Sequence, residues 1–427
     1  MSPENTKSAE SAAAARQLLR SLFDEALAAV DPLHCVAAHL PARPPSRTLI
    51  VGAGKASARM ARAVEAAWDG PLSGLVVTRY GHAEVCSRIE VVEAAHPVPD
   101  AAGAIAAQRM LDLARGMGAG DLVLALVSGG GSSLITLPAA GLTVEDLRGI
   151  NRALLNSGAP IGEMNMVRRH LSAIKGGRLA FACGAAAVHT LVISDVPGDD
   201  PAVVASGPTV PDHSHPQDAL DVLQRRGIAV SEAVMRVLQR PVSSAPTGSQ
   251  GSRDVRVIAT ADTALQAVIA KAQQLGLEVT NLGGNIEGEA REVAKQHAAM
   301  ALELRASKRP GDKPRLLISG GETTVTVTGQ GRGGRNSEYL LSLAIALNGA
   351  AGIHALACDT DGIDGVEDNA GGHIGPDSLH RAAALGLSPQ ALLDNNDAYA
   401  FLSALGSLIT TGPTRTNVND FRALLIA

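Results

Sequence analysis

The stretch TLIVGAGKASARM (48–60) decides the fold. A short apolar run, TLIV (48–51), ends in Gly52-Ala53-Gly54, and residues 55–68 then have the periodicity of a helix. Short apolar strands that alternate with helices are typical of a parallel sheet covered on both faces. The stretch therefore predicts an α/β fold.

The same alternation extends through the first 240 residues. Thr143 and Asp146 resemble a capping box, which would open one further helix. The expected strands here are 48–51, 75–78, 89–94, 121–127 and 188–194, and the expected helices are 8–30, 55–68, 101–115 and 163–182.

A break follows at RPVSSAPTGSQGSR (240–253), which is rich in Ser, Pro and Gly and has no periodicity. We therefore expect an N-terminal α/β domain over 1–240, a linker over 241–253 and a C-terminal α/β domain over 254–427. The alternation in TTVTVTG (323–329) favours a strand antiparallel to its neighbours. The other elements expected in the C-terminal part are strands at 254–260, 277–282, 315–319, 353–359, 407–410 and 421–426, and helices at 262–275, 288–306 and 336–347.

Composition narrows the class of protein. Hydrophobic residues make up 46% and charged residues 19% of the 427 positions, which excludes a disordered chain. A net charge of −5 and only 2% aromatic residues argue against a nucleic-acid partner. The four cysteines form no CxxC pair, so neither a disulfide framework nor a zinc site is expected. The chain has no signal-peptide pattern and no apolar run of roughly 18 residues. We expect a cytoplasmic protein without a membrane partner.

Glycine-rich turns after strands are the strongest functional signal, because ligands of open α/β sheets bind beyond the carboxyl ends of strands. Gly52 and Gly54 allow close backbone approach, and Lys55 stands at the start of the following helix. Ser57 occupies the third glycine position of a dinucleotide fingerprint, and the spacing of a Walker A motif is absent. The turn therefore either binds an anion or is a tight turn with a solvated lysine.

A second turn, LVSGGGSSLITLP (126–138), contains three consecutive glycines flanked by serines. Successive backbone N–H groups and hydroxyls of this kind form a nest for a carboxylate or a phosphate. The candidate residues of this nest are Ser128, Gly129, Gly130, Gly131, Ser132 and Ser133.

Two further segments of the N-terminal part carry candidates. Asp195 stands just after an expected strand, where it would meet a ligand or a metal, or cap a turn. The expected helix in NMVRRHLSAIKGGRLA (165–180) contains Arg168, His170 and Lys175, which do not all share one face. Some of these three are therefore structural, and Arg168 is the candidate for a substrate or phosphate.

The C-terminal part adds another group of candidates. Glu322 follows two glycines, and Arg335 and Asn336 stand at a glycine-rich helix start, where an arginine suits phosphate oxygens. The loop CDTDGIDG (358–365) contains Asp359 and Asp361, which either hold Mg²⁺ together with phosphate oxygens or are solvated. Asn417 would orient a substrate or cap a turn. These residues indicate a second place for phosphate chemistry.

In this order, seven motifs resemble those of the class II glycerate kinases, also called the MOFRL family: GAGKAS, SGGGSSL, NMVRRHLSAIKGGRLA, ISDVPGDDPAVVASGPT, GGETTVTVTGQGRGGRN, CDTDGIDG and TGPTRTNVND. The resemblance covers about residues 15 to 425 and has no departure at the motif cores. It implies an N-terminal Rossmann-like domain with a parallel sheet, a C-terminal MOFRL domain with a mixed sheet, and an active site in the cleft between them.

The activity that the resemblance implies is transfer of the ATP γ-phosphate to D-glycerate, giving 2-phosphoglycerate and ADP, with Mg²⁺ or another divalent cation. The family's essential lysine and arginine match Lys55 and Arg335. Asp195 is then the candidate general base or metal ligand, and Asp359 and Asp361 are the candidates for Mg²⁺.

Two other functions compete with this one. Family members often carry the label hydroxypyruvate reductase, which would require NAD(P)H and is opposed by the incomplete fingerprint. A non-catalytic sensor that closes on a small phosphorylated acid would bind ligand without turnover. A homodimer is expected only from the frequency of dimers among metabolic enzymes.

Overall fold

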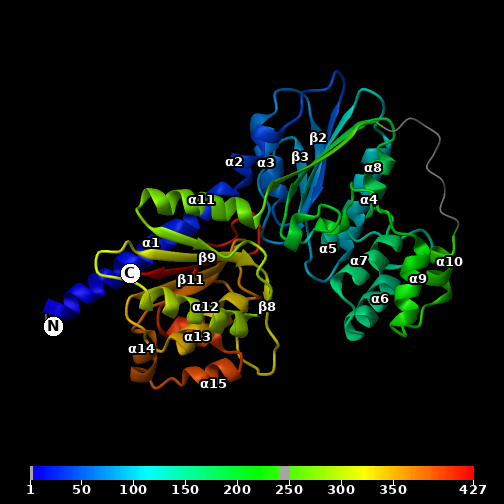
Figure 1. Ribbon diagram of the computed structural model, residues 1–427. Coiled ribbons are helices and arrows are strands. Elements are labelled where there is room, and N and C mark those ends of the chain that lie inside the picture. Colours follow the sequence, from blue (N-terminus) through cyan, green and yellow to red (C-terminus); the bar gives the residue numbers. More distant parts are fainter. Residues whose placement is uncertain (1–2, 241–250) are drawn as a thin grey trace. The chain divides into compact units, whose positions relative to one another are not determined.

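The computed structural model describes residues 3–240 and 251–427, with side chains from residue 10 onward, and it divides into two compact units (Figure 1). One unit spans Pro32–Ile258, and the other joins the N-terminal segment up to Asp31 with Ala259–Ala427. This corrects the expected boundaries of 1–240 and 254–427. Most of the expected linker lies outside the described residues.

Two elements account for the difference. The strand β6 (Arg253–Ala259) is the edge strand of the sheet in the Pro32–Ile258 unit, next to β5. The chain passes into the other unit at Ala259, where β6 ends. The helix α1 (Pro3–Ala29) belongs to the second unit, where Leu19, Leu22 and Phe23 are fully buried. The ring of Phe23 stacks on that of Phe421 at 5.9 Å. Local sequence predicted both elements but not the sheet that each would join.

The Pro32–Ile258 unit contains a six-stranded sheet in the order β3-β2-β1-β4-β5-β6. Each neighbouring pair from β3 to β5 is parallel, as expected for the Rossmann-like class. The first five strands are β1 (Thr48–Ala53), β2 (Ser73–Arg79), β3 (Ile89–Ala94), β4 (Leu122–Ser128) and β5 (Ala187–Ile193). The strand order reverses between β1 and β4, which makes their carboxyl ends the topological switch point, where such sheets bind ligands.

Helices cover this sheet, and one expected helix is interrupted. The capping box of Thr143 and Asp146 is confirmed at the start of α6 (Val144–Asn156). The expected helix 163–182 is wrong in its middle. α7 (Ile161–His170) ends at His170, Ser172 bridges to Pro138, and Gly176 and Gly177 adopt left-handed φ values of 60° and 79° just before α8 (Arg178–Ala182). The other helices of the unit are α2 (Pro32–Cys35), α3 (Ser57–Ala67), α4 (Ala101–Arg115), α5 (Gly131–Leu134), α6 (Val144–Asn156), α7 (Ile161–His170), α8 (Arg178–Ala182), α9 (Pro216–Arg225) and α10 (Glu232–Leu238).

The other unit has a mixed sheet in the order β13-β12-β11-β14-β9-β7, in which only the β7–β9 pair is parallel. The expected antiparallel strand over 323–329 is wrong. Only β10 (Thr323–Thr324) forms there, and it pairs in parallel with β8 (Gly288–Glu289) in a separate small sheet. The strands of the large sheet are β7 (Glu278–Asn281), β9 (Arg315–Gly321), β11 (Ile353–Asp359), β12 (Gly371–Ile374), β13 (Leu408–Ile409) and β14 (Asp420–Ile426).

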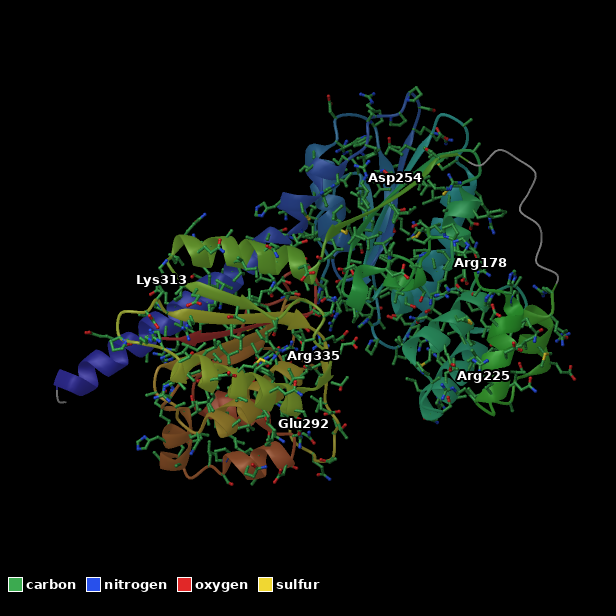
Figure 2. The ribbon with its side chains drawn as sticks, viewed as in Figure 1. Arg178, Arg225, Asp254, Glu292, Lys313 and Arg335 are labelled. Carbon is green, nitrogen blue, oxygen red and sulfur yellow. The ribbon has the colours of Figure 1, made fainter. Side chains whose placement is uncertain are left out.

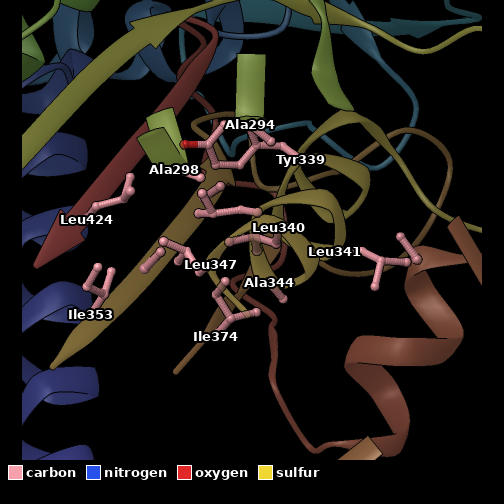
Figure 3. Close-up of a cluster of buried hydrophobic side chains, with 14 of the residues drawn as sticks. Ala294, Ala298, Tyr339, Leu340, Leu341, Ala344, Leu347, Ile353, Ile374 and Leu424 are labelled. Carbon is pink, nitrogen blue, oxygen red and sulfur yellow. The ribbon is translucent and has the colours of Figure 1, made fainter. Parts of the chain in front are cut away.

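Figure 3 shows the apolar core of this unit, where α12 (Ala290–Ala306) and α13 (Arg335–Leu347) pack together beside the sheet. Leu340, Ala344 and Leu347 recur along α13 at helical spacing and meet Ile353 of β11 and Leu424 of β14. This packing fixes the N-terminal end of α13, where Arg335 stands. The unit also contains α11 (Ala261–Gln274), α14 (Ser378–Ala384), α15 (Pro389–Asp394) and α16 (Ala398–Ala404).

Within residues 3–240 and 251–427, no helix is both long enough and apolar enough to cross a membrane.

Candidate active site

The two glycine-rich turns expected to bind an anion meet at the switch point of the parallel sheet. The backbone N–H of Lys55 donates to the carbonyl of Gly129 at 2.8 Å, and the N–H of Ala56 donates to Oγ of Ser128 at 3.0 Å. Gly54 has φ of 142°, and a Cβ there would lie 2.1 Å from Oγ of Ser128. Glycine is therefore required at position 54 for the two turns to touch.

Lys55 itself lies against the second turn. A Cβ on Gly130, whose φ is 78°, would lie 3.4 Å from Cγ of Lys55 and 3.0 Å from the imidazole ring of His96. The glycine run thus leaves room for a lysine stem and for a histidine that sequence reasoning missed. No local pattern around His96 indicated this position, because only the fold brings the segment after β3 to this edge.

Ser132 connects the nest to two more residues that sequence reasoning did not assign to the site. Its hydroxyl lies 3.0 Å from Oγ of Ser206 and accepts a hydrogen bond from Nζ of Lys175, also at 3.0 Å. Burial and, to a smaller extent, the charge of Arg168 together lower the pKa of Lys175 to about 7. The hydroxyl of Ser133 instead donates to the carbonyl of Gly130.

Arg168 is half-buried on α7, and burial lowers the pKa of its guanidinium. Its Nε donates to Oδ1 of Asn151 at 2.8 Å, and its Nη1 lies 3.3 Å from Oδ1 of Asn165. Both partners are neutral amides, so the positive charge of Arg168 is not cancelled by them.

Asp195 lies two residues beyond β5, which pairs with β4 up to the register of Ser128 with Ile193. Because the strands are parallel, this carboxylate follows the same edge of the sheet as the glycine nest. Its role as a general base stays a prediction.

In the other unit, Arg335 is surrounded by carboxylates (it is labelled in Figure 2). Its Nε donates to Asp420 at 2.8 Å, its Nη1 to Glu322 at 2.6 Å and its Nη2 to Asp359 at 2.8 Å. The carboxylates of Asp359 and Asp420 are buried, whereas the Glu322 side chain is 45% exposed. These three neighbours raise the pKa of Arg335, although burial alone would lower it.

The two asparagines proposed from sequence are both buried. Asn336 is fully buried, and its Nδ2 donates to Oδ1 of Asp420 at 2.7 Å. Asn417 is 2% exposed, and its Oδ1 accepts from the backbone N–H of Asn419. Asn336 thus shares its acceptor, Asp420, with Arg335.

The acidic loop after β11 is also largely occupied by hydrogen bonds within the protein. Asp359 accepts from Arg335 through Oδ2 and from the N–H of Asp361 through Oδ1, and Asp361 accepts from the N–H of Ile363. In the part of the chain that the structure describes, no group of three His, Cys, Asp or Glu side chains is arranged around a metal position. Mg²⁺ commonly takes one or two carboxylates and completes its shell with phosphate and water, so the carboxylates of this loop suit it chemically.

Comparisons with known proteins agree with this architecture. The family described as "Domain of unknown function (DUF4147)" matches residues 18–239, and the MOFRL family matches residues 315–420. An Agrobacterium vitis protein named "Putative hydroxypyruvate reductase" is 52% identical over 96% of this chain and 94% of its own length. The D-glycerate 2-kinase of Thermotoga maritima is 40% identical over 95% of this chain and 97% of its own.

Solved structures extend the likeness to three dimensions. The crystal structure of glycerate kinase from Thermotoga maritima matches with a TM-score of 0.89 at 40% identity, over 97% of this chain and 100% of that one. The two family matches, the relatives and the shared fold agree. This chain belongs to the class II glycerate kinase family, which combines a DUF4147 domain with a MOFRL domain.

Proposed function

We propose that this protein is a glycerate 2-kinase, which transfers the γ-phosphate of ATP to D-glycerate and releases 2-phosphoglycerate and ADP. The observation that carries the proposal is the pairing of two glycine turns at the switch point, with Lys55 against the nest. Backbone N–H groups and a cation at such a point suit an anionic substrate. The names of the relatives supply the substrate class.

Phosphoryl transfer depends on positioning and on charge stabilisation, and different groups of the chain would supply each. In our proposal the N–H groups and hydroxyls of the nest hold an anionic group, and Lys55 neutralises charge on the transferring phosphoryl group. Asp195 accepts the proton of the reacting hydroxyl. Mg²⁺, held through Asp359 and Asp361, would neutralise charge on the nucleotide phosphates.

Arg335 would be the second cation of the reaction, and its surroundings suggest how it engages. Each of its three donor directions already meets a carboxylate. Glu322 is the most exposed of these partners, so its ion pair is the cheapest to exchange for a phosphate oxygen. We propose that Asp359 and Asp420 keep the guanidinium oriented while the Glu322 pair opens.

Hydroxypyruvate reduction is the second candidate, because the 52% identical relatives from Agrobacterium vitis carry that name. The switch point favours the kinase. Where a dinucleotide fingerprint has its third glycine, Ser57 is fully buried, and its Oγ lies within hydrogen-bond distance of the carbonyls of Gly54 and Val77, to one of which it donates. In addition, β2 ends at Arg79 rather than at the acidic residue that binds the ribose of NAD, which opposes NADH as the cofactor, whereas an arginine there would suit NADPH.

One assay separates these functions. The purified protein is incubated with ATP, Mg²⁺ and D-glycerate, ADP release is coupled to a signal, and the product is passed to enolase. Direct enolase coupling identifies a 2-kinase, whereas a need for added phosphoglycerate mutase identifies a 3-kinase. Lys55→Ala should lose at least about 10³-fold in turnover, and Lys271→Ala, on α11, should not. NAD(P)H oxidation with hydroxypyruvate and no ADP release would refute the proposal.

A further inference from the structure

We infer that Lys175 is a positioning residue that holds the hydroxyl of Ser132 as a hydrogen-bond donor to an anionic oxygen of the substrate. The inference rests on the proposed function, because it assigns the reaction's anionic ligand to this end of the nest. The ligand chemistry is an oxyanion, which either the carboxylate of glycerate or a phosphate of the nucleotide supplies.

The first argument is an uncompensated charge. Lys175 is only 6% exposed, and the hydroxyl of Ser132 is the single hydrogen-bond partner of its Nζ among the side chains that the structure describes. No described carboxylate lies within ion-pair distance of that nitrogen, and Arg168, the neighbouring cation, also bonds only to neutral amides. An ammonium buried without a counter-ion costs several kcal/mol, which an anionic ligand would offset.

The depressed pKa of Lys175, about 7, agrees with this reading, because burial acts on it first and the charge of Arg168 second. Two cations side by side without a carboxylate make a site that lacks an anion. Ion pairs elsewhere in this unit show the contrast, since Arg169 has Asp212 at 3.0 Å.

The second argument is the direction of the hydrogen bonds. A protonated Lys175 can only donate, so Oγ of Ser132 accepts from it. Ser132 and Ser206 share one further hydrogen bond, and whichever of them donates it, one hydroxyl hydrogen of the pair is left for an outside acceptor. Ser206 is 1% exposed whereas Ser132 is partly exposed. The remaining hydrogen therefore belongs to Ser132, the member that a ligand can reach.

The third argument is backbone strain beside the trio. Ala205 and Ser206 both adopt left-handed φ values, 52° and 60°, although neither is glycine. A Cβ on Gly131 would lie 2.7 Å from Cβ of Ala205, so the strained segment is pressed against the nest. Non-glycine residues hold such conformations where surrounding structure enforces them, and they cluster at ligand sites. Here the strain places Oγ of Ser206 against Ser132.

The test combines kinetics, binding and stability in the full chain. Lys175→Met and Ser132→Ala are each expected to raise the KM for one substrate by about tenfold to a hundredfold, with a smaller change in kcat. The substrate whose KM rises, D-glycerate or ATP, identifies the source of the anion. Because the two residues act as one unit, adding Ser132→Ala to Lys175→Met should raise that KM by less than twofold more.

Lys175→Met should also melt at or above the temperature of the wild type, because it removes a buried charge that has no counter-ion. A purely structural lysine would give the opposite pattern, with lower stability and unchanged KM. Lys295→Met is the matched control, since Lys295 is exposed on α12 and pairs with Glu292. If Lys175→Met does not fold, Ser132→Ala alone must still show the rise in KM.

Failure of the inference and failure of the proposed function give different results. An active wild type whose KM values stay within twofold in both variants overturns the inference and leaves the kinase in place. If the wild type shows no kinase activity, calorimetric titration with inorganic phosphate still decides. Weaker phosphate binding by Lys175→Met than by the wild type supports the inference, and equal binding overturns it.

Discussion

Replacing Arg335 by alanine tests the electrostatic design of the C-terminal unit. The change removes one cation from among three carboxylates, so it acts on stability and on catalysis together. Turnover should fall by at least about 10³-fold, by analogy with arginines that stabilise a transferring phosphoryl group. The fold should weaken as well, because the carboxylates that remain repel each other.

The size of the stability loss follows from the three contacts. Hydrogen bonds to charged groups contribute about 1.5–3 kcal/mol each. The bond to Glu322 is discounted because that side chain is 45% exposed. The bonds to the buried Asp359 and Asp420 remain, and together they predict a loss of about 3–6 kcal/mol, near the roughly 3–5 kcal/mol for a broken buried ion pair.

Urea unfolding at several pH values measures this loss, and the coupled kinase assay measures turnover. In the variant Asp420 keeps its ion pair with Arg422, whereas Asp359 and Glu322 lose their arginine; lower pH weakens the repulsion among the carboxylates, so Arg335→Ala should recover part of its stability deficit as the pH falls. Arg332→Ala is the control. The Arg332 side chain is 62% exposed, pairs with Glu367 and lies over the ring of Tyr399, so its loss should cost less stability than the loss of Arg335. A loss below 1 kcal/mol for Arg335→Ala, with no pH dependence, would refute the reasoning.

Three further changes test other parts of the structure. Gly54→Ala should cost more than about 3 kcal/mol by urea unfolding and abolish turnover, because its Cβ would lie 2.1 Å from Oγ of Ser128; a stable, active variant contradicts the contact between the turns. Asp121→Asn should lose about 2 kcal/mol at pH 7, since Arg47 holds the pKa of Asp121 well below its ordinary value. The Asp121 carboxylate stabilises the wild type fully only above its ordinary pKa of about 3.9. The difference in unfolding free energy between wild type and Asp121→Asn should therefore shrink as the pH falls below about 4, and a constant difference contradicts the ion pair. Ser57→Gly completes a GxGxxG pattern but should give no NADH binding in fluorescence titration, and saturable binding would revive the reductase.

The fold was largely predictable where local pattern decides it. The apolar run ending in Gly52 and Gly54 predicted a strand, a turn and a helix. The structure has β1 before the turn and α3 after it. The short strand β12 (Gly371–Ile374) was missed because two of its four residues are glycines, which lack strand propensity, and antiparallel pairing with β11 and β13 forms it. The break at Gly176 and Gly177 was missed because the helical spacing of apolar residues continues across it.

The candidate site was also predictable only in part. Residue type and position after a strand were sufficient to select Lys55, the serine–glycine nest and Arg335. Neither the partners of Arg335 nor the burial of Asn336 follows from sequence, because Glu322, Asp359 and Asp420 come from three separate segments.

By itself, the sequence determined the class of fold and the position of the glycine-rich turns after strands, since strand periodicity and glycine content are properties of adjacent residues. Tertiary structure alone decided that β6 joins the first sheet and α1 the second unit, because strand pairing and helix burial are long-range choices among competing surfaces. It likewise decided the lowered pKa of Lys175, since a lysine loses its ordinary pKa only when folding removes water without supplying a counter-ion.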